Sequence, residues 1–194
     1  MKSKNTFLWV ALFISHSACA PSSISTPVSV NTKAVPIQPA TTLPTSAEAS
    51  MSLQLTSDAF VNGQSIPAKY SCIGKGISPA LTWTEPPAGT QSFALIMDDP
   101  DAPGRTFVHW VLFNIQPQLR SLKEDLPITG KNVDPNAIFF GSNSTGATAY
   151  QGPCPPSGTH RYFFKLYALD TLISLLPGAT KEQVLKEMEG HVLA

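Results

Sequence analysis

The sequence predicts a mainly β domain that begins near Met51 and carries one late helix. Eighteen prolines and twelve glycines in 194 residues separate short apolar runs, a spacing typical of short strands joined by turns. Hydrophobic residues make up 42% of the chain, which is enough to form the core of one domain of ordinary size.

Six stretches have the alternation or the short apolar run expected of β-strands: residues 52–57, 80–83, 92–98, 107–115, 137–140 and 160–170. Only residues 180–190, "TKEQVLKEMEG", have a helical pattern. Thr180 and Gln183 stand at the positions of a capping box, and Gly190 is placed to end the helix. The sequence therefore predicts many strands and a single clear helix.

The first 18 residues have the layout of a secretory signal peptide. Two lysines precede an apolar run, residues 7–14, that is too short to span a bilayer, and small residues follow it. "SAC" resembles the end of a lipoprotein box, although His16 stands where such boxes usually carry Leu, so we expect cleavage before Cys19 and lipidation of that residue. A plain secretory cut after Ala20 would put Pro21 beside the scissile bond and is the first alternative, ahead of an uncleaved anchor.

Residues 19–50 are expected to form a disordered tether. Residues 20–50 hold five prolines, eleven Ser or Thr, two charged residues and no aromatic residue, which is too little apolar surface to offset the entropy of ordering. The domain of residues 51–194 would then be exported and held off a membrane of the cell envelope, on the periplasmic or outer-membrane side. Without the lipid it would be secreted.

The charge balance argues against a nucleic-acid partner. The chain has 13 Lys or Arg against 13 Asp or Glu, and charged residues make up only 13% of it. It also lacks a glycine-rich phosphate loop and a "GxSxG" nucleophile elbow. We therefore expect no catalytic residue, no cofactor and no metal site.

Polar residues near predicted strands are the candidates for a binding site. Asp99 and Asp101 directly follow strand 92–98, where a plain turn that ends the strand is the ordinary explanation. His109 is predicted to share a core-facing strand stripe with Phe107, Val111 and Phe113, which is also compatible with an ordinary core histidine.

A shared pocket would account for these residues together. His160 is predicted to share a strand face with Tyr162 and Phe164, and buried Asp and His side chains are costly unless they pair with one another or with a ligand. The rigid "GPCPP" turn would add the backbone N–H groups of Gly152 and Cys154, and a concave group of such donors suits an anion.

Three stretches, "DPDAP" (99–103), "VHWVLFN" (108–114) and "GPCPPSGTHRYFFKLYALD" (152–170), resemble the phosphatidylethanolamine-binding protein family in its bacterial Raf-kinase-inhibitor-like branch. The resemblance covers about residues 52–194. It implies two antiparallel sheets in a Greek-key β-sandwich with one or two short peripheral helices. Family members usually continue beyond "GHVLA", so a short C-terminus is expected to alter one pocket wall. The small anion pocket implied by the resemblance is lined by Asp99, Asp101, His109, Gly152, His160 and Tyr162.

Two cysteines remain if Cys19 carries a lipid. Cys72 and Cys154 are an even pair, and such a pair can form a disulfide in an oxidising compartment. Two buried thiols are the alternative. A metal site is disfavoured because the two cysteines lack a CxxC spacing.

Three functional classes fit this sequence, and we favour a non-catalytic envelope binding protein. Its pocket would hold a small phosphorylated or other anionic ligand, and a protein partner is a further expectation. The first alternative is a phosphatase or phosphotransferase that uses Asp99 and Asp101 on Mg²⁺. The second is an interaction protein that inhibits an enzyme or protease and whose pocket is vestigial.

The lipoprotein hypothesis predicts that Cys19 is acylated. Metabolic labelling with a palmitate analogue should mark the wild-type chain and should not mark Cys19→Ser. A labelled Cys19→Ser chain, or an unlabelled wild-type chain, would remove the lipid anchor.

Overall fold

The structure is a computed structural model that describes residues 52–127 and 138–194. The expected signal peptide, Cys19, the tether and residue 137 of one expected strand lie outside the described residues. In the described ranges, no helix is long and apolar enough to cross a membrane.

The order of elements follows the predicted pattern of many strands and one late helix. Strands 92–98 and 107–115 were predicted to within one residue, whereas β5 (Ser121–Leu122) was not expected. The 3-10 helix η1 (Ala68–Tyr70) agrees with the expected one or two short helices, although no pattern predicted its position. The elements are β1 (Leu55–Thr56), η1 (Ala68–Tyr70), β2 (Leu81–Trp83), β3 (Ser92–Asp99), β4 (Phe107–Ile115), β5 (Ser121–Leu122), β6 (Phe139–Phe140), β7 (Phe163–Leu169) and α1 (Lys181–Met188).

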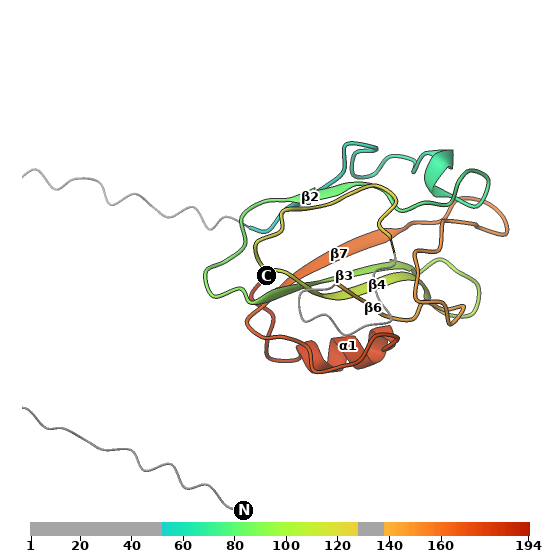
Figure 1. The fold of residues 1–194 in the computed structure, drawn as a ribbon. Coiled ribbons are helices and arrows are strands. Elements are labelled where there is room, and N and C mark those ends of the chain that lie inside the picture. Colours follow the sequence, from blue (N-terminus) through green and yellow to red (C-terminus); the bar gives the residue numbers. More distant parts are fainter. Residues whose placement is uncertain (1–51, 128–137) are drawn as a thin grey trace, which may run out of the picture. The chain divides into compact units, whose positions relative to one another are not determined.

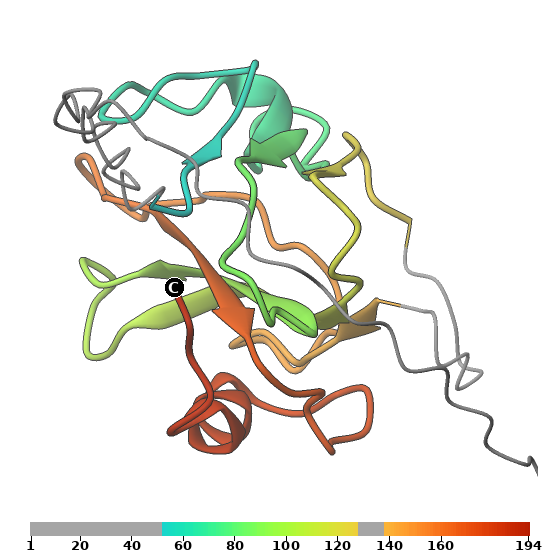
Figure 2. The same ribbon diagram turned by 90° about the vertical axis from the view of Figure 1, so that its left-hand side faces the viewer.

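The strands form two antiparallel sheets. The smaller has the order β1-β2-β5 and the larger the order β6-β4-β3-β7. The smaller sheet lies on one side of the larger sheet and α1 lies on the other (Figures 1 and 2). The predicted mainly β fold with two packed sheets is therefore confirmed.

The central strand β3 is buried on both faces and divides the core in two. Leu95 and Met97 lie between the sheets, in one cluster with Trp83 of β2. Ala94 faces the other way and belongs to a second cluster with Val184 of α1. This alternation is the two-residue period of a strand, and it places consecutive β3 residues in different environments.

One feature fixes the start of α1 and another joins it to the larger sheet. The Thr180 side chain accepts from the Gln183 amide while the Gln183 side chain accepts from the Thr180 amide, so the predicted capping box is confirmed. Asp98 of β3 accepts hydrogen bonds from Lys181 of α1 and Lys165 of β7. Burial raises the pKa of Asp98, but the bonds from Lys181 and Lys165 outweigh it and leave that pKa below its usual value.

β4 carries an irregularity at His109. Its register with β3 shifts between Trp110 and Val108, which leaves His109 as the extra residue of a β-bulge. The prediction that His109 shares a face with Phe107, Val111 and Phe113 was therefore wrong for Val111 and Phe113, whereas the ring centroids of His109 and Phe107 lie 4.8 Å apart. The Val111 and Phe113 side chains pack in the cluster under α1, and the His109 ring lies outside that cluster.

β7 begins at Phe163, so the predicted strand of residues 160–170 starts too early. The amide of Arg161 donates to the Asp101 side chain (2.8 Å) rather than to a neighbouring strand. His160 and Tyr162 therefore lie in the loop before β7, and the prediction that they share a strand face with Phe164 was wrong.

The ion pairs of Asp98 predict a pH-dependent contribution to stability. Asp98→Ala leaves Lys181, only 16% exposed, without its partner, and breaking a buried pair of this kind costs about 3 kcal/mol. Because the folded pKa of Asp98 is depressed, the contribution is fully present above the unfolded Asp pKa of about 3.9 and is lost as the pH falls through the folded value. Urea unfolding between pH 7 and pH 3 measures it.

Asp170→Ala is the matched control for this measurement. Its hydrogen bond with His191 joins side chains that are 45% and 48% exposed, so removing it should cost less than about 1 kcal/mol. Equal losses of unfolding free energy in the two variants would contradict the role given to Asp98.

Candidate functional site

A pocket of about 270 Å³ lies between the loop that follows β3, the start of β4 and the loop that precedes β7. This volume is slightly below the range of roughly 300–1,000 Å³ that holds drug-sized ligands, so the pocket suits a small headgroup. Five of the six predicted site residues line it, and Asp101 is the exception. The lining residues are Asp99, Ala102, Pro103, Arg105, Phe107, His109, Gln151, Gly152, Cys154, Pro155, Pro156, His160 and Tyr162.

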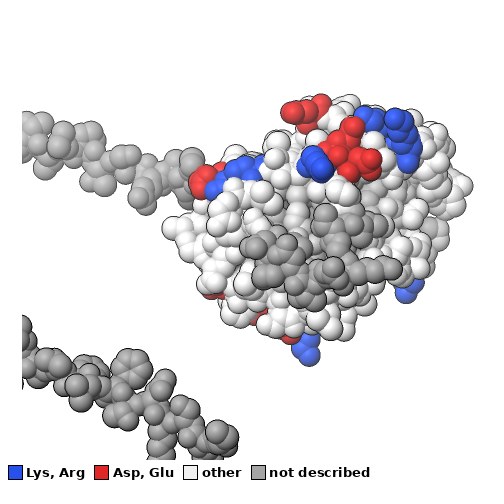
Figure 3. Space-filling view, in the orientation of Figure 1, with Lys and Arg blue, Asp and Glu red and all other residues white. Residues whose placement is uncertain are grey.

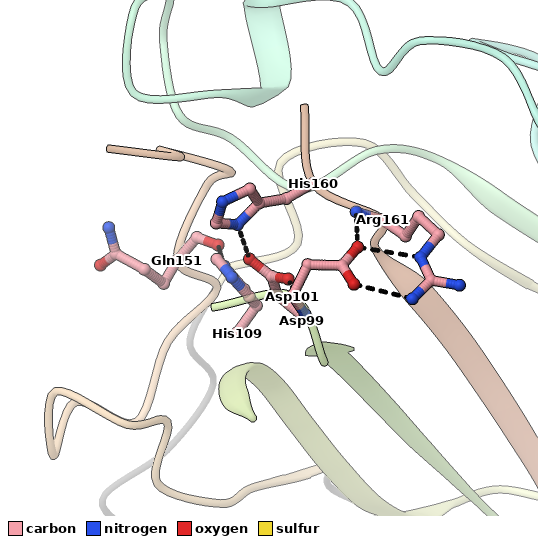
Figure 4. Close-up of polar contacts among 6 residues, drawn as sticks. All are labelled: Asp99, Asp101, His109, Gln151, His160 and Arg161. Atoms are coloured by element: carbon pink, nitrogen blue, oxygen red, sulfur yellow. Dashed lines mark hydrogen bonds and ion pairs between the residues drawn. The ribbon is translucent and has the colours of Figure 1, made fainter. Parts of the chain in front are cut away.

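Asp99 orients His160 at the inner end of the pocket. The Oδ2 atom of Asp99 lies 2.7 Å from Nδ1 of His160 (Figure 4). A carboxylate oxygen can only accept, so Nδ1 carries the hydrogen and Nε2 is the nitrogen that has no partner among the described residues. Both side chains are nearly buried, at 4% and 10% exposure.

His109 is held in the same way by a main-chain group. Its Nδ1 lies 2.7 Å from the carbonyl oxygen of Gln151, so this nitrogen also carries a hydrogen (Figure 4). Burial lowers the pKa of His109, and the bond to Gln151 and the charges of Asp99 and Asp98 only partly oppose this effect. The ring is therefore neutral near pH 7, with Nε2 as an acceptor.

Tyr162 brings a third polar group to the pocket. Its ring meets that of His109 edge to face, with 5.2 Å between centroids. Its hydroxyl is buried and has no hydrogen-bond partner among the described residues. Burial, followed by the charges of Asp99 and Asp101, raises the pKa of Tyr162 to about 12, so the hydroxyl keeps its proton.

Asp101 positions the loop before β7 rather than lining the pocket. It accepts from the backbone amide of Arg161 and from Nε and Nη2 of the same residue at 2.7 to 2.9 Å (Figure 4). Its own amide donates to Asp99 Oδ1 (2.8 Å). Asp101 thus ties the loop after β3 to the residue that directly follows His160.

The loop of residues 151–156 is fastened to the chain around η1. Cys72 and Cys154 form a disulfide, which confirms the predicted pairing, and the Cys72 amide donates to the Pro153 carbonyl (3.0 Å). A Cβ added to Gly152 would lie 2.8 Å from the Tyr70 carbonyl oxygen, closer than real Cβ atoms come. Only glycine lets the two segments approach this closely, so this pocket wall has a fixed position.

Sequence reasoning missed two polar lining residues, Gln151 and Arg105. Gln151 acts through its carbonyl group, which every residue has, so its identity gave no signal. Arg105 is an exposed cation in the loop between β3 and β4. Its place between the stretches "DPDAP" and "VHW" was a usable signal, because both stretches supply pocket residues.

The fold and the site define a two-sheet β-sandwich with a small polar pocket built from loops at the ends of its central strands. A family model described as "Phosphatidylethanolamine-binding protein" matches residues 56–194. The chain belongs to the phosphatidylethanolamine-binding protein family, as its motifs indicated.

Curated relatives and solved structures agree with this assignment. A "UPF0098 protein" of Methanothermobacter thermautotrophicus is 51% identical over 141 residues, which is 73% of this chain and 92% of that protein. Another, from Aquifex aeolicus, is 48% identical and covers 73% of this chain and 83% of its own length.

Two crystal structures have the same fold. A protein of Chlamydia trachomatis described as a phosphatidylethanolamine-binding protein (PEBP) homologue has a TM-score of 0.67 at 41% identity, over 73% of this chain and 91% of that one. Escherichia coli YbcL, described as a new member of the mammalian PEBP family, has a TM-score of 0.66 at 32% identity, over 73% and 92%.

The disulfide should contribute strongly to stability. The cysteines are 82 residues apart in sequence, and in the loop-entropy model closing a loop of that length stabilises the folded state by roughly 4 kcal/mol. A Cys72→Ser/Cys154→Ser variant should lose about that much free energy of unfolding, measured with urea. Reductant should destabilise the wild-type chain and leave the variant unchanged; a wild type indifferent to reductant would contradict the prediction.

Proposed function

We propose that this chain is a non-catalytic binding protein whose pocket takes a small anionic group such as a phosphate. The Tyr162 hydroxyl is the observation that carries the proposal. The hydroxyl oxygen is buried and has no hydrogen-bond partner among the described residues, and Tyr162 is one of the residues that line the pocket. An unsatisfied buried hydroxyl costs about 1–3 kcal/mol, and a bound anion would remove that cost by accepting its hydrogen.

The two imidazole rings become hydrogen-bond donors to the pocket when they are protonated. Nδ1 of each ring is already committed, to Asp99 for His160 and to Gln151 for His109, so an added proton goes to Nε2. Protonated Nε2 can donate a charge-assisted bond to an anion. The amides of Gly152 and Cys154 donate to no backbone carbonyl in the described ranges, and they are further candidate donors.

The arrangement of the aspartates favours binding over phosphoryl transfer. The Asp99 oxygens accept from His160 and from the Asp101 amide, and both Asp101 oxygens accept from Arg161. A nucleophile and acid pair on Mg²⁺ needs both carboxylates to face the same site, yet Asp101 does not line the pocket. A binding role therefore accounts better for these contacts.

A small ligand also agrees with the surface charge. On the face seen in Figure 3, acidic and basic side chains lie beside one another rather than forming a patch of one sign. A nucleic-acid ligand would require a basic patch or stripe.

Export to the cell envelope is part of the proposal. The disulfide between Cys72 and Cys154 supports it, because disulfides persist in oxidising compartments and are rare in the cytosol. The lipid on Cys19 would then hold the domain at a membrane. As a secondary proposal, the chain binds a protein partner and thereby modulates an enzyme or protease. If variants with substituted pocket residues still capture that partner, the result favours this role over ligand binding.

Anion binding should weaken as the pH rises. A bound anion raises the pKa of His109 above its depressed value in the unbound chain. The resulting affinity is fully present below the unbound pKa and is lost as the pH rises through the bound pKa, so binding should be tighter at pH 5.5 than at pH 8. Dimethyl phosphate is a suitable probe, because it stays a monoanion over this range.

Titration calorimetry on three variants tests the same proposal. His109→Ala and His160→Ala each remove a charge-assisted bond of roughly 1.5–3 kcal/mol, so dimethyl phosphate should bind about tenfold to a hundredfold more weakly. His191→Ala is the control, because its ring is paired with Asp170 at the surface. An affinity for dimethyl phosphate that depends neither on pH nor on either pocket histidine would contradict the proposal.

A further inference from the structure

One cation at the pocket, Arg105, has no partner among the described residues. The described residues contain three arginines, and two of them are paired with carboxylates: Arg120 with Glu85 and Arg161 with Asp101. Arg105 lines the pocket, is exposed, and makes no hydrogen bond or ion pair with the described residues. An exposed guanidinium without a partner among the described residues is available to a ligand.

Arg105 and the buried donors occupy different parts of the pocket. His160 and Tyr162 contribute groups that are largely hidden from solvent, whereas Arg105 is solvent-exposed. The apolar residues Phe107 and Pro155 also line the pocket. A ligand that satisfies all of these groups is anionic at its inner end and has a second acceptor near the opening.

We propose that Arg105 selects ligands that carry a carboxylate next to the phosphate, as in a phosphoserine headgroup, over those that carry only an ammonium. The inference rests on the anion-binding function proposed above and names its ligand class. The planar fork of a guanidinium matches a carboxylate with two parallel hydrogen bonds. An ammonium at the same place meets a like charge.

Asp99 does not reverse this preference. It is the carboxylate that would otherwise attract an ammonium into the pocket, but its two oxygens already accept from His160 and from the Asp101 amide. Asp99 keeps its charge, but its side chain is only 4% exposed, whereas Arg105 is exposed and makes no ion pair with the described residues. Because Arg105 is exposed, we expect its contribution to the binding free energy to be that of a surface ion pair. This corresponds to at most about fivefold in affinity, unless both guanidinium hydrogen bonds to the carboxylate form.

Two pairs of soluble probes measure the effect of the carboxylate on affinity and distinguish the source of the ligand. O-phosphoserine and O-phosphoethanolamine are free monoesters; glycerophosphoserine and glycerophosphoethanolamine are the diesters found in lipid headgroups. Within each pair the molecules differ only by the carboxylate. Calorimetric titration of the full chain with all four probes should give tighter binding of the serine member, by about fivefold. The pair that binds tighter overall indicates a lipid headgroup or a free phosphoester.

Substitution of Arg105 decides the inference. Arg105→Gln should bring the serine and ethanolamine probes to within about twofold of each other, and Arg105→Lys should keep part of the preference. Lys186→Gln is the control, because Lys186 is an exposed cation on α1 and does not line the pocket. Wild-type binding without a serine preference, or a preference kept in Arg105→Gln, overturns the inference and leaves anion binding intact. Failure of every probe to bind overturns both.

Discussion

The carboxylate of Asp99 is the contact on which the pocket depends. One of its oxygens holds Nδ1 of His160, and the other holds the amide of Asp101, whose side chain in turn fixes Arg161. A single buried group at the end of β3 therefore sets the path of the loop that follows it and the position of the loop that precedes β7. Each of its two hydrogen bonds has a charged acceptor, the kind that contributes most in a partly buried site.

The pocket combines walls that are fixed with donors that are left unsatisfied. The loop of residues 151–156 is attached to the chain near η1 by a covalent bond and by a backbone approach that only Gly152 permits. The hydroxyl of Tyr162, in contrast, is buried without a partner in the described ranges. A rigid frame can maintain such an unfavourable group, although the group lowers the free energy of unfolding. Preorganised binding sites have this kind of cost.

The sequence was informative where local pattern and structure coincide. The longest strands and the capping box of Thr180 follow from periodicity and from residue type, and the motifs located five pocket residues. It failed where tertiary contacts override the period: a bulge at His109 breaks the alternation of β4, and the bond between Asp101 and Arg161 delays the start of β7. The role of Gln151 could not be predicted, because a backbone carbonyl carries no residue-specific signal.

The neighbouring aspartates of β3 restrict how this domain can vary. Asp98 holds α1 on one face of the larger sheet, while Asp99 holds His160 on the other face. Inserting or deleting one residue within β3 would exchange their directions, placing each carboxylate on the wrong side of the sheet. A change in the length of β3 would therefore disrupt both contacts. The side chains of the pocket loops, in contrast, can change without moving Asp98 or Asp99.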